Sequence, residues 1–169
     1  MKMNLPNKLT VARIIMVPIT MALLMMGYNI WALVVFAIAS FTDFLDGYIA
    51  RKYNLVSAFG KIMDPLADKL LVFGALLAFI ALGKVSLWAP MIIISREFFV
   101  TCMRVVAVAE GKVIAASMWG KIKTNVQLFA LIFSMLFIEQ AAIFIWVSAL
   151  FTLASWVAYI VENKEVFRG

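Results

Sequence analysis

The feature that most constrains this chain is a run from Ile14 to Thr42 that contains no charged residue. One membrane crossing by a helix needs only about 20 mostly apolar residues, so the run is too long for a single span. Gly27-Tyr28-Asn29 lies inside it, and this combination of residues favours a turn. We therefore predict two helices joined by a tight turn, each long enough to cross a lipid bilayer.

The rest of the sequence follows the same pattern, with further turns at Gly83-Lys84 and Glu139-Gln140. Of the 169 residues, 66% are apolar and 14% are charged, whereas a soluble domain has about 25% charged residues. We predict an all-α polytopic membrane protein in which residues 1–169 form one domain. Its six predicted spans are Leu9–Tyr28, Trp31–Tyr53, Phe59–Leu82, Trp88–Ala109, Trp119–Ile138 and Ala141–Val161.

The basic residues indicate an orientation for these spans. If the N-terminus is inside, every Lys and Arg except Lys84 falls toward the inner side, as the positive-inside rule requires. Both termini are then cytoplasmic. The first segment carries Arg13 near its start and has no small-residue cleavage site, so we interpret it as a retained helix rather than a signal peptide. The net charge of +6 favours anionic lipids or an anionic substrate over nucleic acid.

Residue types that are rare or absent narrow the chemistry. The chain has no His and a single Cys, Cys102, which excludes intrachain disulfides, Cys/His zinc sites and histidine acid–base catalysis. Any bound metal must be held by oxygen. All Asp residues of the chain fall within one short window: Asp43, Asp46, Asp64 and Asp68.

Helical spacing places these carboxylates on two helix faces. The first face carries Asp43, Asp46, Gly47 and Ala50, at i, i+3, i+4 and i+7. The second carries Gly60, Asp64 and Asp68, at i, i+4 and i+8. A short inner connection makes the second and third spans antiparallel neighbours, which can bring the two faces together at the cytoplasmic end.

Four carboxylates in a low-dielectric setting need compensation by protons or cations. Mg²⁺ prefers oxygen ligands, and two ions flanking a phosphate would neutralise charge on it. The small residues leave room for a ligand near the backbone. A plainer alternative is that the acids cap helices or pair with Arg51, Lys61 and Lys69. Because all four Asp residues share this window, a metal site is the favoured interpretation.

The same residues carry a specific resemblance. The pattern Asp-x2-Asp-Gly-x2-Ala-Arg-x8-Gly-x3-Asp-x3-Asp, from Asp43 to Asp68, resembles the signature of the CDP-alcohol phosphatidyltransferases, six-helix membrane enzymes of phospholipid synthesis. Three further motifs resemble a bacterial branch whose acceptor is glycerol 3-phosphate. They are Pro6-Asn7-x2-Thr10-x2-Arg13, Arg96-Glu97-Phe98 and Gly120-Lys121-Ile122-Lys123-Thr124.

The resemblance implies roles for the site residues. Two ions, Mg²⁺ or Mn²⁺, would be held by Asp43, Asp46 and Asp64. Asp68 would be the general base on the acceptor hydroxyl, with a further metal contact. The CDP part of CDP-diacylglycerol would lie over Gly47, Ala50 and Gly60 with Arg51 beside its phosphates, and CMP would be released. Asn7 and Thr10 would either contact the nucleotide or cap the first helix.

An acceptor that carries its own phosphate needs fixed cations. Arg96 and Arg104 are eight residues apart on the fourth span, and Lys121 and Lys123 open the fifth from the same inner side. These four residues are the predicted acceptor-phosphate site. Alternatively, Arg96 pairs with Glu97 or with the aspartates, and the lysines only set the topology.

Other functions stay open at this stage. Within the family, the acceptor could instead be serine or an inositol phosphate. Outside enzymes, the chain could be a catalytically silent scaffold. A divalent-cation transporter could use the same acids, although no second acidic set completes a pathway. The resemblance also implies a multi-pass protein of the bacterial cytoplasmic membrane, with its site facing the cytoplasm, in contact with membrane lipids and possible as a homodimer.

Overall fold

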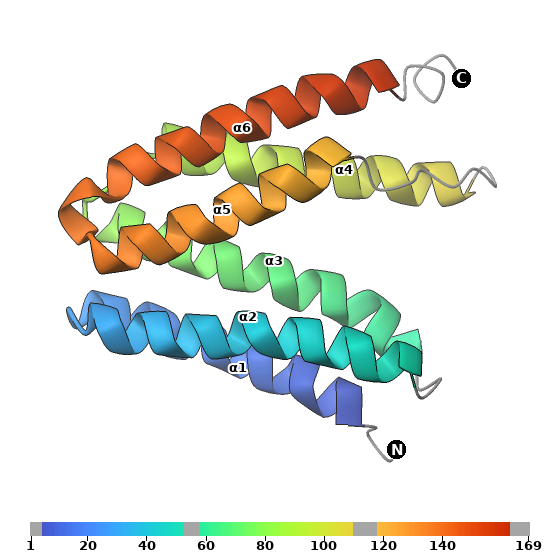
Figure 1. The fold of residues 1–169 in the computed structure, drawn as a ribbon, viewed down its shortest axis with the longest axis horizontal. Coiled ribbons are helices and arrows are strands. Elements are labelled where there is room, and N and C mark those ends of the chain that lie inside the picture. Colours follow the sequence, from blue (N-terminus) through green and yellow to red (C-terminus); the bar gives the residue numbers. More distant parts are fainter. Residues whose placement is uncertain (1–4, 53–57, 110–117, 163–169) are drawn as a thin grey trace. The chain divides into compact units, whose positions relative to one another are not determined.

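The computed structural model describes residues 5–52, 58–109 and 118–162, apart from the side chains of residues 5, 6, 44, 46–52, 58, 59, 61, 62 and 109. These ranges contain helices and no strand (Figure 1). In chain order the helices are α1 (Leu5–Met25), α2 (Asn29–Lys52), α3 (Ala58–Ala81), α4 (Trp88–Ala109), α5 (Met118–Leu136), a short 3₁₀ turn η1 (Ile138–Gln140) and α6 (Ala141–Glu162). The six predicted helices are therefore confirmed, with ends within a few residues of those expected.

The turn predicted between the first two helices is built by a glycine. Gly27 has φ +79°, a left-handed conformation that residues with a Cβ rarely adopt. Its N–H donates to the carbonyl of Leu24 at 3.0 Å, and the N–H of Tyr28 donates to that of Leu23 at 2.9 Å. This pair of bonds is a Schellman motif, which satisfies carbonyls that the end of α1 would otherwise leave unbonded.

The chain divides into two compact units, Met1–Gly83 and Lys84–Gly169. In the first unit, α1 packs against both α2 and α3 and makes most of the contacts between helices (Figure 1). In the second unit, α6 has the corresponding role and packs against both α4 and α5. Each unit thus has one helix that organises the other two.

A glycine in α3 allows α1 to approach closely. A Cβ built on Gly74 would lie 2.7 Å from Val17 Cγ1 and 3.2 Å from Met21 Sδ, both on α1. Real Cβ atoms essentially never approach another atom as closely as 2.7 Å, so a larger residue at position 74 would force the side chain of Val17 to move. The close packing brings the earlier turns of α1 within reach of polar side chains on α3.

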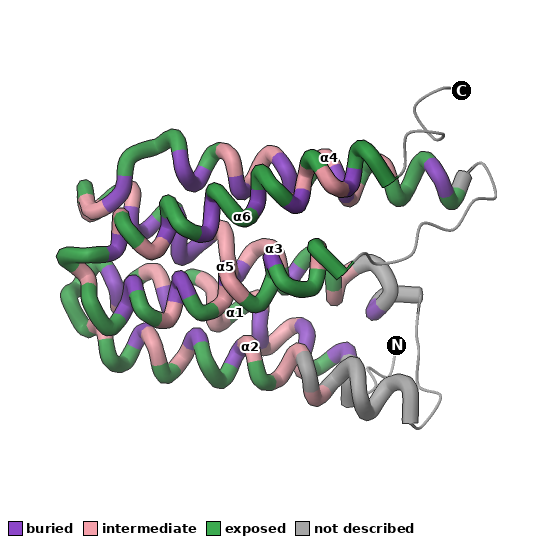
Figure 2. Tube along the Cα trace, turned by 45° about the horizontal axis from the view of Figure 1, so that its top comes forward, coloured by how far each residue is buried: buried purple, intermediate pink, exposed green. Residues whose placement is uncertain are grey.

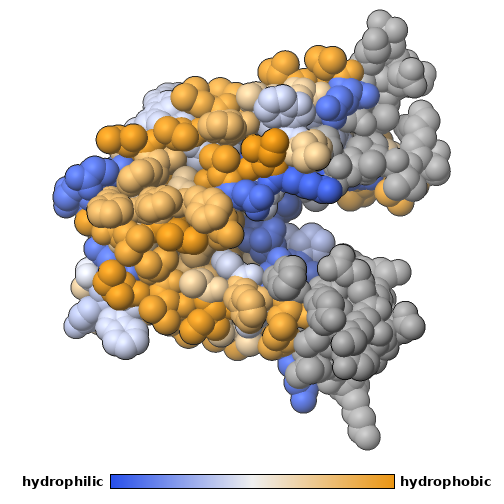
Figure 3. Space-filling view, viewed as in Figure 1, coloured by the Kyte–Doolittle hydropathy of each residue, from blue (hydrophilic) through white to orange (hydrophobic). Residues whose placement is uncertain are grey.

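Many large apolar side chains lie on the surface, and several polar side chains are buried. Large apolar side chains such as Ile15, Trp31 and Val161 are exposed, whereas polar ones such as Arg13 and Lys123 are buried. Buried positions recur between exposed ones along each helix (Figure 2), and apolar side chains cover much of the surface in view (Figure 3). Extensive exposed apolar surface is typical of a membrane-facing or partner-facing protein.

Two segments of the described helices are long and apolar enough to cross a membrane, Asn7–Met25 and Ile138–Glu162. A shorter apolar helical segment covers Asn29–Asp43. The middle helices carry more charge, as in α3 with Asp64 and Asp68, which lowers their hydropathy. The layout of six membrane spans remains a prediction.

Candidate active site

Helix α1 supplies two donors to the aspartate motif. Thr10 Oγ1 donates to Asp64 Oδ1 at 2.5 Å, and Arg13 NH1 donates to Asp43 Oδ1 at 2.6 Å. Thr10 and Arg13 are three residues apart, which places them on one face of α1. Asp43 from α2 and Asp64 from α3 therefore both lie beside that face. Helix α1 thus binds one aspartate from each half of the sequence motif.

The donors are far more buried than the carboxylates that they bind. Thr10 and Arg13 are fully buried, whereas the side chain of Asp43 keeps 42% of its surface exposed. A buried guanidinium requires an anionic partner, since desolvation alone would be costly. Arg13 thus fixes one oxygen of Asp43 and leaves the carboxylate accessible to solvent.

The other described members of the predicted site differ in exposure. Asp68 is exposed, as a base that must reach a substrate would be, while Gly60 and Asn7 are buried. Because α1 begins at Leu5, Asn7 and Thr10 lie inside the helix. The alternative in which either caps its N-terminus is therefore wrong.

Four predicted nucleotide and metal residues lie on α2 with side chains outside the described set: Asp46, Gly47, Ala50 and Arg51. Among the side chains that are described, no group of three or more acids or cysteines gathers closely enough to hold a metal. The oxygen atoms present nevertheless suit a hard divalent cation as ligands, since Asp43 and Asp64 supply carboxylate oxygens and Thr10 supplies a hydroxyl. With Asp46 undescribed, the metal site stays a prediction.

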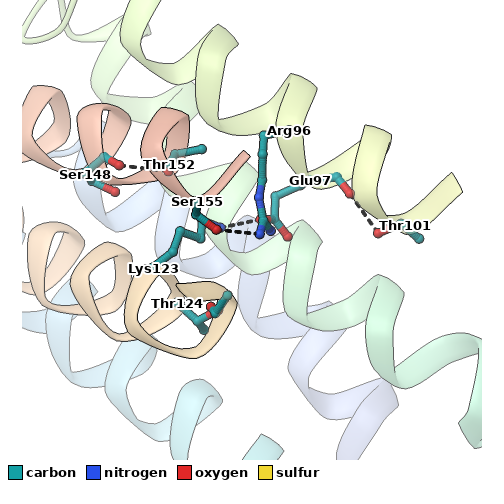
Figure 4. Close-up of polar contacts among 9 residues, drawn as sticks. Arg96, Glu97, Thr101, Lys123, Thr124, Ser148, Thr152 and Ser155 are labelled. Atoms are coloured by element: carbon teal, nitrogen blue, oxygen red, sulfur yellow. Dashed lines mark hydrogen bonds and ion pairs between the residues drawn. The ribbon is translucent and has the colours of Figure 1, made fainter. Parts of the chain in front are cut away.

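The second unit contains a buried polar cluster, which we name the Glu97 cluster after its central residue (Figure 4). Arg96 NH1 donates to Glu97 Oε1 at 3.1 Å, and Arg96 NH2 donates to Ser155 Oγ at 2.8 Å. Lys123 Nζ donates to the same Glu97 Oε1. One carboxylate oxygen on α4 therefore holds two cations, and the cluster joins α4, α5 and α6.

The four predicted acceptor-phosphate residues fall into two pairs. Arg96 and Lys123 belong to the Glu97 cluster, where their side chains are only 8% and 3% exposed. Arg104 and Lys121 are exposed. The alternative that Arg96 pairs with Glu97 is confirmed.

Sequence reasoning missed three contributors to these sites. Arg13 was used only as a topological charge and a motif position, although it lies three residues from Thr10 on the same face of α1. The link from Glu97 to Lys123 and the role of Ser155 were not anticipated. A signal for Ser155 existed, because Ser148, Thr152 and Ser155 recur at helical spacing on apolar α6 and all three are buried.

Comparison with known proteins shows the family of the chain. A family model described as CDP-alcohol phosphatidyltransferase matches residues 3–154, and the chain belongs to this family. It is thus an enzyme of the CDP-alcohol phosphatidyltransferase type.

Several relatives match over nearly their full length and share one name, "CDP-diacylglycerol--glycerol-3-phosphate 3-phosphatidyltransferase". The protein of that name from Bacillus subtilis is 40% identical to this chain, covering 98% of the chain and 97% of the relative. Those from Rickettsia typhi and Haemophilus influenzae are each 35% identical, over 97% of this chain and 99% and 95% of the relatives.

Proposed function

We propose that this chain transfers the phosphatidyl group of CDP-diacylglycerol to glycerol 3-phosphate, giving phosphatidylglycerophosphate and CMP. The observation that carries the proposal is the match over nearly the full length to relatives named for this reaction. The complete motif from Asp43 to Asp68 supports it. The enzyme would act in phospholipid biosynthesis at the bacterial cytoplasmic membrane.

The proposed reaction is a direct displacement at phosphorus. Asp68 removes the proton from the acceptor hydroxyl, whose oxygen attacks the phosphorus that carries diacylglycerol. The bond from that phosphorus to the oxygen shared with CMP breaks, and CMP leaves with the electron pair. The exposure of Asp68 suits this role, because a general base must come within hydrogen-bond distance of its substrate.

Two divalent ions, Mg²⁺ or Mn²⁺, would be held by Asp43, Asp46 and Asp64, with Asp68 near them. When bound, such ions neutralise the negative charge that develops on a diphosphate. The contribution of α1 would be to orient the carboxylates, since Thr10 and Arg13 each fix one oxygen of an aspartate. Site geometry held by part-buried hydrogen bonds from buried donors requires little rearrangement during the reaction.

The CDP part of the donor would lie over Gly47, Ala50 and Gly60, with Arg51 near its phosphates. The absence of large side chains at these positions favours close approach of a ligand to the backbone. Asn7 would contact the nucleotide from α1. Thr10 would act mainly through Asp64, because its hydroxyl already donates to that carboxylate.

The phosphate of the acceptor would be bound by Arg104 and Lys121, whose side chains are exposed, whereas Arg96 and Lys123 are held in the buried Glu97 cluster. Arginine binds phosphate in a planar bidentate geometry, whereas lysine acts as a point charge. This preference for a phosphorylated alcohol makes serine a weaker candidate.

We also propose that all six helices cross the membrane, with both termini and the aspartate motif on the cytoplasmic side. The support is the exposed apolar surface and the distribution of basic residues, of which only Lys84 falls outside. Membrane lipids would contact that surface. A homodimer remains an expectation from the family.

The test is an acceptor panel with the purified full-length chain, CDP-diacylglycerol and Mg²⁺ or Mn²⁺. Release of CMP is measured with glycerol 3-phosphate, serine or an inositol phosphate as the alcohol. We expect glycerol 3-phosphate to be preferred, and Asp68→Asn to abolish turnover.

A preference for another alcohol would overturn the proposed acceptor. Transport of Mg²⁺ into liposomes without CMP release would indicate a transporter, and activity unaffected by Asp68→Asn would remove that residue from the mechanism.

A further inference from the structure

The Glu97 cluster places two buried cations on one carboxylate. The side chains of Arg96, Glu97 and Lys123 are 8%, 12% and 3% exposed, so water screens them poorly. With two positive charges and one negative, the three side chains carry a formal charge of +1. Burying such a group is a weak source of stability compared with apolar packing, which favours a functional reason for it.

The cluster also provides a direct polar bond between α4 and α5. Helix α6 packs against both of them, and Arg96 reaches it through Ser155. The bond from Lys123 to Glu97 joins α4 to α5 without α6 (Figure 4). Three threonine hydroxyls in that view, those of Thr101, Thr124 and Thr152, donate to backbone carbonyls of their own helices.

The exposed cations lie close to this bond along each helix. Arg104 follows Glu97 by seven residues, two helical turns later on the same face of α4. Lys121 precedes Lys123 by two residues in the first turns of α5. The bond between Lys123 and Glu97 therefore joins the stretches of α4 and α5 that carry Arg104 and Lys121.

We propose that Glu97 is a positioning residue for the acceptor's phosphate group. It does not touch the phosphate. It holds Lys123 and Arg96 together against their mutual repulsion and so sets where Arg104 and Lys121 stand. The inference rests on the proposed function, because it assigns the two exposed cations to a phosphate monoester.

The test uses steady-state kinetics of the full-length chain with each substrate varied in turn. Glu97→Gln removes the negative charge and keeps the size of the side chain. We expect its KM for glycerol 3-phosphate to rise about ten-fold, the order of effect for one lost hydrogen bond to a charged group, with an unchanged KM for CDP-diacylglycerol. The inhibition constant of inorganic phosphate against glycerol 3-phosphate should rise in parallel.

A double variant separates positioning from stability. Glu97→Met with Lys123→Met removes the buried ion pair, keeps the formal charge of the cluster at +1 and fills a similar volume. Replacing a buried ion pair by apolar side chains is often neutral or stabilising, but Arg96 also loses the carboxylate of Glu97, so the unfolding temperature should lie between those of Glu97→Gln and the wild type. We expect the raised KM for glycerol 3-phosphate to persist, because two methionines make no directional bond.

Glu139→Gln is the matched control. Glu139 pairs with Lys84 in the same unit at 2.5 Å, but their side chains are 71% and 31% exposed, so its loss should leave both KM values unchanged. A wild-type KM for glycerol 3-phosphate in the double variant, or an equal rise in both KM values, would overturn the positioning role. If the proposed function itself is wrong, the wild type will release no CMP with glycerol 3-phosphate.

Discussion

The pair formed by Arg13 and Asp43 predicts an unequal response to the loss of either partner. Arg13 is fully buried, whereas the side chain of Asp43 is 42% exposed. In Arg13→Met, the carboxylate loses this donor and can turn to water. In Asp43→Asn, the guanidinium loses an anion at a position with no access to solvent. The second change should therefore cost more free energy of unfolding.

The magnitudes follow from the geometry. A hydrogen bond between charged groups contributes about 1.5–3 kcal/mol, so we expect about 2 kcal/mol for Arg13→Met. Removing one partner of a buried ion pair costs about 3–5 kcal/mol, and we expect about 3 kcal/mol for Asp43→Asn because its pair is only half-buried. For a chain of this size each kcal/mol lowers the unfolding temperature by about 2–4 °C.

The assay is thermal unfolding of the purified chain in detergent with EDTA, so that no divalent ion contributes. Lys84→Met serves as the control, since it breaks an exposed ion pair and should shift the unfolding temperature by less than about 2 °C. The variant that carries both Arg13→Met and Asp43→Asn should be more stable than the sum of the two single losses predicts. Equal losses for the two single variants, or a loss for Arg13→Met no larger than that of the control, would refute the reasoning.

Three further predictions address packing, orientation and the metal. Gly74→Ala should destabilise the fold by about 1–3 kcal/mol, because its Cβ would lie 2.7 Å from Val17 Cγ1; thermal unfolding should show recovery when Val17→Ala is added. Thr10→Val removes the donor to Asp64 and should lower kcat about ten-fold, whereas Thr10→Ser keeps a hydroxyl and should retain most activity. EDTA should abolish CMP release and Mn²⁺ should restore it; activity that survives complete removal of divalent ions would contradict the metal site.

The helices were predictable because their signals are local. The uncharged run predicted two helices, and Gly27 predicted the turn between them. In the structure, Gly27 has the positive φ that favours glycine. The start of α1 was placed too late, at Leu9 instead of Leu5, because apolar length defines a membrane span and a helix can continue through polar residues such as Lys8.

The site was predictable in part. Asp43 and Asp64 were predicted to meet through direct packing of their helices, whereas in the structure both are bound by one face of α1. The buried polar residues Asn7, Thr10 and Arg13 recur every three residues and mark that face, but spacing does not show which of these side chains binds Asp43. Only the packed structure reveals that Arg13 does so. The partnership of Glu97 with Lys123 likewise depends on how α4 and α5 lie in space, since residues 26 positions apart carry no local signal.

The central claim is the transfer of a phosphatidyl group to glycerol 3-phosphate. Its most direct test supplies the full-length wild-type chain with CDP-diacylglycerol, a divalent cation and glycerol 3-phosphate, and quantifies CMP together with the lipid product by mass spectrometry. We predict CMP and phosphatidylglycerophosphate in equal amounts, both dependent on glycerol 3-phosphate and both absent with Asp68→Asn. CMP release that does not depend on glycerol 3-phosphate, or a lipid product that lacks it, would contradict the claim.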